Sequence, residues 1–167
     1  MRKVLMISTA VAALAAAGSA SALTATTTFQ VTATVQKVCS VTATALAFGN
    51  YTPGAGAIPG NSTLNVKCTK GTTFTVALDK GTTAGGTSAQ RLMTAGGADR
   101  LQYNLYTTAA FATLFGDGTT GAVGSGTGTG LATNVALTVF GNLPDSAANQ
   151  AVTPGAYADT IGVTVTY

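Results

Sequence analysis

Side chains that carry acid–base or nucleophilic chemistry are scarce in this sequence of 167 residues. Histidine and glutamate are absent, which leaves five aspartates as the carboxylates. Most of these aspartates adjoin glycine, proline or lysine, as in Asp79-Lys80-Gly81 and Pro144-Asp145, a setting typical of turns. General acid–base catalysis needs a histidine or a tuned carboxylate, and a serine triad needs a base. The sequence therefore predicts no catalytic residue, and we do not expect an enzyme.

The glycine-rich segment 116–130 is a second place to look for ligand chemistry, because glycine-rich loops can cradle phosphates. It contains Gly126-Thr127-Gly128-Thr129-Gly130, but it lacks the lysine of the G-x-x-x-x-G-K-[ST] motif. There is no D-x-[DN]-x-[DN]-G calcium loop, and two cysteines without a histidine do not complete a zinc site. We therefore expect no metal, no cofactor and no small-molecule substrate. We expect residues 116–130 to form a long flexible hairpin loop.

The first 22 residues have the pattern of a secretory signal peptide. Arg2 and Lys3 supply positive charge, residues 4–17 are largely apolar, and Ala20-Ser21-Ala22 is a small-x-small cleavage site. The apolar stretch is shorter than the ~20 residues that a membrane-spanning helix needs. We expect cleavage after Ala22 and export, with an uncleaved N-terminal anchor as the alternative.

The chain that remains after cleavage is small and poor in charge. Removing 22 of 167 residues leaves 145, a size that suits one domain. The remaining chain has six cationic side chains and five aspartates, for a net charge of +1. It has no stripe of basic residues that could bind nucleic acid. Charged residues make up 8% of the sequence, against about 25% in ordinary soluble domains. A surface with so little charge favours association over dispersal.

Cys39 and Cys68 are the two cysteines of the chain. Export would place them in an oxidising compartment, where an even number of cysteines indicates a disulfide. A bridge across this separation contributes ~3–4 kcal/mol by closing a loop in the unfolded chain. We predict a Cys39–Cys68 disulfide that ties the first strand to the second, with two buried free thiols as the alternative.

Strand patterns dominate the sequence after residue 22, whereas no segment there repeats apolar residues at helical spacing. Residues 23–36 alternate apolar or small side chains with threonine and glutamine, which predicts a long strand with one apolar face. About seven short strands with turns between them indicate a β-sandwich, so the predicted fold class is all-β. The shorter strands are expected near 38–41, 62–68, 72–79, 91–93, 101–106, 111–115 and 131–140, with loops at 53–60 and 141–155.

The last eleven residues carry the cleanest alternation in the chain. A final strand with such a face needs a neighbour to cover its side of the core, and an open edge of that kind invites pairing with another chain. Strand addition supplies main-chain hydrogen bonds and pockets for alternate side chains. We expect residues 23–36 of one copy to fill this gap in another, with pairing inside the same molecule as the alternative. The large residues at odd positions are Tyr157, Ile161, Val163, Val165 and Tyr167.

Further motifs accompany this alternation. Phe48-Gly49-Asn50-Tyr51 follows the first cysteine, and the second cysteine ends Asn65-Val66-Lys67-Cys68. The most specific motif is G-x-Y-x-D-x-I-x-V-x-V-x-Y, which spans residues 155–167. Together these features resemble the spore coat protein U domain family, which includes the pilins of archaic chaperone–usher pili. The resemblance covers essentially the whole chain after residue 22.

The resemblance implies an immunoglobulin-like sandwich that lacks its last strand and is completed by a strand from another molecule. In that family a periplasmic chaperone lends the strand first, and an outer-membrane usher exchanges it for the N-terminal segment of the next subunit. Mapped here, residues 1–22 are the signal peptide, 23–36 the donor strand and 37–167 the pilin domain. The implied donor side chains are Phe29, Val31, Ala33 and Val35, and the implied acceptor groove is lined by the C-terminal strand with Tyr157, Ile161, Val163, Val165 and Tyr167.

The expected function is therefore a secreted structural subunit of a cell-surface fibre, polymerised by donor-strand exchange and supporting adhesion and biofilm formation. The expected partners are identical or related subunits, a periplasmic chaperone and an outer-membrane usher. Its expected route runs through the periplasm to the cell surface. The alternative is a protective spore or cell coat component of the same family. A carbohydrate-binding adhesin is less favoured, because the chain has one domain and no tryptophan.

Overall fold

The computed structural model describes residues 21–167. The predicted signal peptide lies almost wholly outside this range. Residues 21–38 contain no helix or strand, and the side chains of Leu23, Phe29 and Val31 are almost fully exposed. The strand predicted for residues 23–36 is thus not formed in the single chain, because an extended segment becomes a strand only when its backbone groups find a partner. No helix within residues 21–167 is long and apolar enough to cross a membrane.

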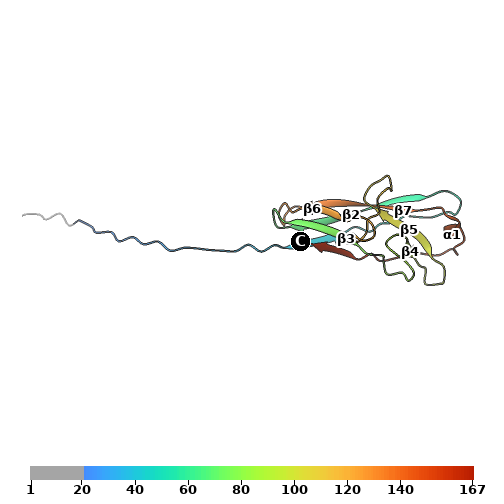
Figure 1. The fold of residues 1–167 in the computed structure, drawn as a ribbon, viewed down its shortest axis with the longest axis horizontal. Helices are drawn as coiled ribbons and strands as arrows, with labels where there is room; N and C mark the ends of the chain where they lie inside the picture. The colour runs from blue at the N-terminus through green and yellow to red at the C-terminus, as the bar shows by residue number, and fades with distance from the viewer. Residues whose placement is uncertain (1–20) are drawn as a thin grey trace, which may run out of the picture. The chain divides into compact units, whose positions relative to one another are not determined.

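Residues 35–167 form one compact unit made of two antiparallel sheets (Figure 1). The larger sheet has the strand order β1-β2-β7-β5-β4, and the smaller has the order β6-β3-β8. One helical turn, α1, lies at the end of this unit opposite the C-terminus (Figure 1). The elements are β1 (Cys39–Ala43), β2 (Ile58–Cys68), β3 (Thr73–Leu78), β4 (Arg91–Met93), β5 (Leu101–Tyr106), β6 (Gly124–Thr127), β7 (Val135–Leu143), α1 (Ala147–Gln150) and β8 (Val163–Thr166).

The core lies between the two sheets and follows the period of two that the sequence predicts. On β3, Phe74, Val76 and Leu78 are buried, while the residues between them face outward. On β2, Leu64 and Val66 are buried in the same alternating way. Each sheet therefore presents one apolar face to the other. The prediction of an all-β sandwich is confirmed.

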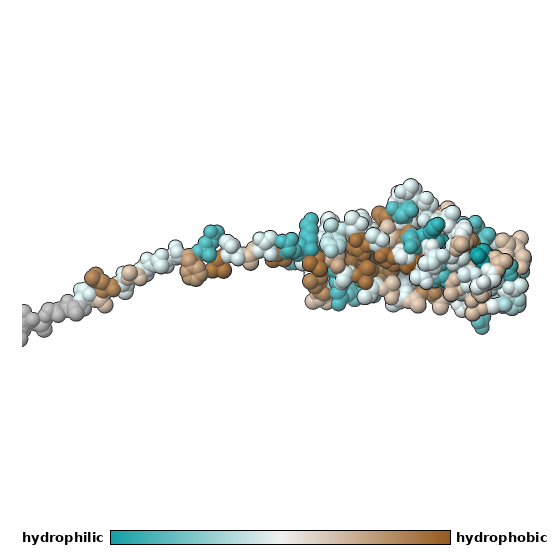
Figure 2. All heavy atoms as spheres, turned by 90° about the horizontal axis from the view of Figure 1, so that it is seen from below, coloured by the Kyte–Doolittle hydropathy of each residue, from teal (hydrophilic) through white to brown (hydrophobic). Residues whose placement is uncertain are grey.

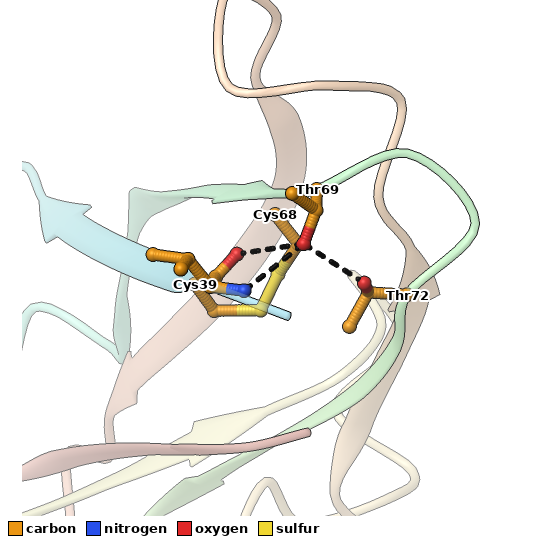
Figure 3. Close-up of a disulfide and its surroundings, with 5 residues drawn as sticks. Cys39, Cys68, Thr69 and Thr72 are labelled. Carbon is orange, nitrogen blue, oxygen red and sulfur yellow. Dashed lines mark hydrogen bonds between the residues drawn. A yellow bond between two sulfur atoms is a disulfide. The ribbon is translucent and has the colours of Figure 1, made fainter. Parts of the chain in front are cut away.

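A disulfide joins Cys39 to Cys68, whose Cα atoms are 4.1 Å apart, as predicted. The same two residues are direct partners in the register of β1 with β2. Beside them, the Thr69 hydroxyl accepts a hydrogen bond from the Val38 N–H over 3.0 Å and lies 3.1 Å from the Thr72 hydroxyl (Figure 3). The Thr69 N–H donates to the Val38 carbonyl over 3.0 Å. The start of β1 is therefore fixed to the end of β2 both covalently and by hydrogen bonds.

The prediction of a flexible loop over residues 116–130 is wrong for its second half, because β6 pairs with β3 there. A Cβ atom on Gly126 would lie 2.6 Å from the tip of the Phe74 ring, and one on Gly128, directly after β6, would lie 2.6 Å from the Cys68 Cβ. Glycine at alternate positions thus lets the backbone of this strand lie directly on the core. In β6, glycine provides close approach rather than flexibility.

Two strands also extend further than predicted. β2 begins at Ile58 and β7 continues to Leu143, so that Gly60 and Gly141, both expected in loops, are partners across the two strands. Residues 111–115 do not form the expected strand and contribute only isolated bridges at Leu114 and Phe115.

Candidate functional site

A groove of about 1100 Å³ lies between an edge of the larger sheet and an edge of the smaller one. It runs from Ala43 and Val163 toward Pro53 and Val152. Figure 2 shows apolar side chains gathered along one face of the compact unit. The floor of the groove is apolar and comes from both sheets, with Leu64, Leu101, Leu105, Val139 and Leu143 from the larger sheet and Leu78 from the smaller.

One rim of the groove is the segment that continues β1, residues 44–51. Thr44 still pairs with β2, since its N–H donates to the Thr63 carbonyl over 3.0 Å. Beyond it, no backbone group of residues 45–51 bonds to another backbone group of the described chain. This rim therefore has main-chain donors and acceptors available along its length.

Side chains hold this rim in place of backbone hydrogen bonds. Leu46 and Phe48 pack over the glycine pair Gly60–Gly141, where a Cβ on Gly141 would lie 2.8 Å from the Leu46 Cδ1 and 3.0 Å from the tip of the Phe48 ring. The Phe48 ring also meets the Tyr103 ring edge-on, with centroids 6.0 Å apart. The two glycines thus make a flat area on the larger sheet that receives Leu46 and Phe48.

The far end of the same rim is fastened by a carboxylate. Asp145 accepts hydrogen bonds from the Tyr51 hydroxyl over 2.6 Å, from the Gly54 N–H over 3.0 Å and from the Gly56 N–H over 2.9 Å. The bond from Tyr51, followed by those from the two glycines, lowers the pKa of Asp145 to about 2. Desolvation and the same bond raise the pKa of Tyr51 to about 12. The loop that ends this rim is thus tied to residue 145.

The opposite rim is formed by residues 156–163, which lead into β8. The backbone groups of its even-numbered residues bond to the segments that follow β3 in the smaller sheet and β4 in the larger one. Ala158 exchanges two 3.0 Å hydrogen bonds with Thr94, and the Gly162 carbonyl accepts from the Asp79 N–H over 3.1 Å. The backbone groups of Tyr157, Asp159 and Ile161 have no backbone partner in the described chain.

Alternation explains this difference between odd and even residues. In a strand, successive residues direct their N–H and C=O groups to opposite edges, so the odd residues direct theirs toward the groove. The pairing of β3 with β8 extends along this rim by one more residue. Leu78 is the partner of Val163 in the register of the two strands, and the following residue Asp79 donates its N–H to the preceding residue Gly162. Both rims of the groove therefore carry unpaired main-chain groups.

Two aspartates keep the second rim in position. Asp159 accepts from the Thr83 N–H and hydroxyl, both over 2.9 Å, and from the Tyr103 hydroxyl over 2.7 Å. Desolvation opposes these bonds, but together they lower the pKa of Asp159. Asp79 accepts from the Gly162 N–H over 2.9 Å. These contacts are structural and bring no acid–base pair together.

The residues predicted for the acceptor groove divide into two groups. Tyr157, Ile161 and Val163 line the groove. Val165 lies beyond its end, where it packs half-buried against the core, and Tyr167 is exposed. The predicted donor side chains Phe29, Val31, Ala33 and Val35 are all exposed in the single chain.

The first rim and its fastening are not among the features predicted from the sequence. Leu46 and Phe48 alternate within Ala45-Leu46-Ala47-Phe48, and this local signal would have extended the strand predicted at 38–41. The neighbours of Asp145 in the sequence are typical of a turn, and none of them indicates the bond to Tyr51.

The family model of the spore coat protein U domain matches residues 25–164. The chain belongs to the spore coat protein U domain family. The resemblance found in the sequence is thereby confirmed over nearly the whole described chain. No curated protein matches this spore coat protein U domain.

Among solved structures, this spore coat protein U domain is similar to one chain of the pre-assembly complex between CsuC and CsuE, the chaperone and the tip adhesion subunit of the archaic chaperone–usher Csu pili of Acinetobacter baumannii. The sequence identity is 22% and the TM-score is 0.54. The match covers 80% of this chain and 40% of the other, so this chain spans less than half of the length it is compared with. The similarity supports the β-sandwich fold.

Proposed function

We propose that this protein is a secreted structural subunit of a cell-surface fibre, in which residues 23–36 of one copy lie as a strand in the groove of the next. The observation that carries the proposal is the groove, which has an apolar floor and two rims with unpaired main-chain groups. A strand inserted there would bond to both rims and cover the core. The sandwich of one subunit would thus be completed by another.

The segment 23–36 has the properties that such a strand needs. Its apolar side chains recur every second residue, the same spacing as the unpaired backbone groups of the second rim. Phe29, Val31 and Val35 each expose more than 80% of their surface in the single chain. Burying a side chain of this kind contributes ~1.5–3 kcal/mol. Four inward residues, with Ala33 as the smallest, would therefore bind the strand firmly.

The groove would need a cover before assembly, because exposed apolar surface with open strand edges is prone to aggregate. One solved structure that is similar to this chain is a complex of a chaperone with a tip adhesion subunit of a pilus. We propose by analogy that a periplasmic chaperone covers the groove of this chain and that an outer-membrane usher catalyses the exchange. The route would then run through the periplasm to the cell surface, where the fibre would support adhesion and biofilm formation. A structural rather than an enzymatic role agrees with the contacts of the aspartates, which hold loops and rims.

Two matched substitutions in the donor strand test this proposal. Val31→Asp places a carboxylate against the apolar floor of the groove. Burying this unpaired charge out of water costs on the order of several kcal/mol of binding free energy. Thr32→Asp adds the same charge to the face that points to solvent. We expect Val31→Asp to abolish the ladder of heat-labile, SDS-resistant oligomers and Thr32→Asp to retain it. Equal assembly of the two variants would refute the proposal.

A rearranged chain distinguishes pairing between molecules from pairing within one. A copy of residues 23–36 joined after Tyr167 by a flexible linker, with the original segment removed, gives a chain that we name the linked subunit. We expect the linked subunit to be a soluble monomer that unfolds cooperatively, whereas the chain from residue 23 to 167 alone aggregates. A stable, monomeric chain without the added copy would show that the groove needs no strand from outside.

A further inference from the structure

The two ends of the compact unit differ in charge. The C-terminal end consists of residues 37–39, 66–73, 127–135 and 166–167, which the pairings of β1 with β2 and of β3 with β6 and β8 bring together. It contains no aspartate. Its charged side chains are Lys37 and Lys70, which are exposed, and Lys67, which is half-buried.

The α1 end consists of residues 51–59, 94–100 and 143–157, joined by the pairing of β2 with β7 and by the bonds of Thr153 to Asp99. Its charged side chains are Asp99, Arg100 and Asp145. Arg100 lies near Asp99 and contributes to the lowered pKa of that carboxyl, after the hydrogen bonds from Thr153. The excess charge of this end is therefore negative and belongs to Asp145.

The connection between the donor strand and the compact unit is very short. Val38 is the first residue hydrogen-bonded into the larger sheet, through Thr69. Val35 is the last of the predicted donor side chains, so only Gln36 and Lys37 lie between them. The three residue steps from Val35 to Val38, at about 3.6 Å each, span at most ~11 Å. This is about the ~10 Å that separates two sheets in direct contact. If Val35 lies in the groove of one copy, the C-terminal end of its own compact unit must touch that copy.

The shape of the groove indicates which end is touched. β1 and β8 are in contact with each other, and of their residues only Ala43 and Val163 line the groove, so the groove stops where these two strands meet. In the other direction the groove continues to Pro53 and Val152, at the α1 end. A strand that leaves the groove there runs antiparallel to β8, the arrangement with the more stable ladder.

We propose that, in the fibre, the C-terminal end of each copy docks on the α1 end of its neighbour, with the three lysines facing Asp145. This inference rests on the proposed function, because the donor strand holds the two copies together. The partner is a second copy of this chain, favoured by the charge complementarity and by the short connection. The same lysine-bearing end exposes Val38, Leu131 and Tyr167 by 46, 48 and 54%, and the α1 end offers small exposed side chains at Ala147, Ala148 and Pro154.

The docking contact between the two ends would resist bending of the fibre, whereas the donor strand alone would link the copies but leave the joint between them free to bend. The test is therefore the persistence length of fibres measured by electron microscopy, with the SDS-resistant ladder recorded in parallel. Lys70→Glu reverses a charge at the C-terminal end. Lys80→Glu is the matched control, because Lys80 is also exposed but lies at neither end.

We expect Lys70→Glu to shorten the persistence length by about twofold or more in ~0.01 M salt, where charges act over ~30 Å, and Lys80→Glu to leave it unchanged. Adding Ala148→Lys to Lys70→Glu places a new positive charge at the α1 end, which would face the new negative one, and should restore stiffness. Fibres of the unaltered chain should lose stiffness in about 1 M salt, where the screening length falls to ~3 Å.

The outcomes separate the two proposals. An intact ladder together with equal stiffness of Lys70→Glu, Lys80→Glu and unaltered fibres would overturn the docking contact and leave the fibre subunit standing. The absence of any ladder from the unaltered chain would overturn both. If Lys70→Glu gives no fibres, the response of the unaltered fibres to salt decides the question alone.

Discussion

The Tyr51 hydroxyl donates a 2.6 Å hydrogen bond to the Asp145 carboxylate, joining residues 94 apart in the chain at one rim of the groove. The pKa of Asp145 is lowered from 3.8 to about 2, so its contribution to stability is complete above the unfolded value and is lost as the pH falls through the folded one. We expect the loop at residues 51–56 to loosen between these two values. The pH dependence of the Gly54 and Gly56 amide signals in the linked subunit would measure it.

Asp145→Asn is the control for this acid transition. The amide retains size but accepts weaker hydrogen bonds, so the loop should be looser at neutral pH and should show no transition in acid. Asp117, which holds its own turn through the Thr119 and Thr120 N–H groups, lies away from the groove. If Asp117→Asn loosens residues 51–56 as much as Asp145→Asn does, the assignment to Asp145 is wrong.

Arg91 is fully buried, and its guanidinium binds neutral acceptors from separate segments of the chain. It donates to the Asp79 carbonyl over 2.9 Å, to the Asn104 side-chain oxygen over 2.8 Å and to the Phe115 carbonyl over 2.9 Å. Desolvation lowers the pKa of Arg91, which reflects the cost of holding this charge away from water. Arg91→Lys cannot reproduce the planar fork of donors and should destabilise the linked subunit by about 3 kcal/mol or more.

Urea unfolding of the linked subunit would measure this loss. Lys80→Ala, at an exposed position, should change the free energy of unfolding by less than about 0.5 kcal/mol. One removed hydrogen bond costs about 1 kcal/mol. If Arg91→Lys lowers the free energy of unfolding by less than this, the guanidinium donors of Arg91 are not needed for stability.

The glycines of β6 are required by what they face. Gly126→Ala would place its Cβ 2.6 Å from the tip of the buried Phe74 ring and should destabilise the linked subunit by ~1–3 kcal/mol. Gly97→Ala is the control, since no atom beyond its two chain neighbours lies within 4 Å of its Cβ position. We expect thermal unfolding to show a clear drop for Gly126→Ala and little change for Gly97→Ala. Similar melting temperatures would mean that β6 does not lie on the core as described.

The Cys39–Cys68 bond is expected to be complete in the exported protein. Thiol reagents should therefore modify neither cysteine in the denatured, unreduced chain. Replacing both cysteines by alanine should lower the stability of the linked subunit by ~3–4 kcal/mol, since the bond closes a long loop of the unfolded chain. Labelling of either residue without reduction would contradict this prediction.

Local patterns allowed most of the fold to be predicted. The alternation in β2, β3 and β5 is visible in any short window, because one face of each strand is buried. The Cys39–Cys68 bond followed from the number of cysteines and the expected export. Both inferences need only residues that are close in sequence or few in number.

The features that were missed depend on partners far along the chain. The glycine-rich sequence around Gly126 predicts a flexible loop, and only the position of Phe74 beneath Gly126 shows why glycine is needed there. Leu46 forms part of a rim only because Gly60 and Gly141 provide a flat area for it. Nothing local indicates that Arg91 is buried, since its acceptors are backbone carbonyls and one asparagine that come from other segments.

The position of the disulfide has a mechanical consequence for the proposed fibre. Tension along such a fibre would pass from one copy to the next through the backbone between Val35 and Val38 and would enter the compact unit at the first residue of β1. Without the disulfide, this load would fall first on the few hydrogen bonds that join the five-residue edge strand β1 to β2. Because Cys39 is bonded to Cys68, the load would bypass β1 and pass into β2, whose ladder with β7 spans nine residue pairs and would be sheared as a whole.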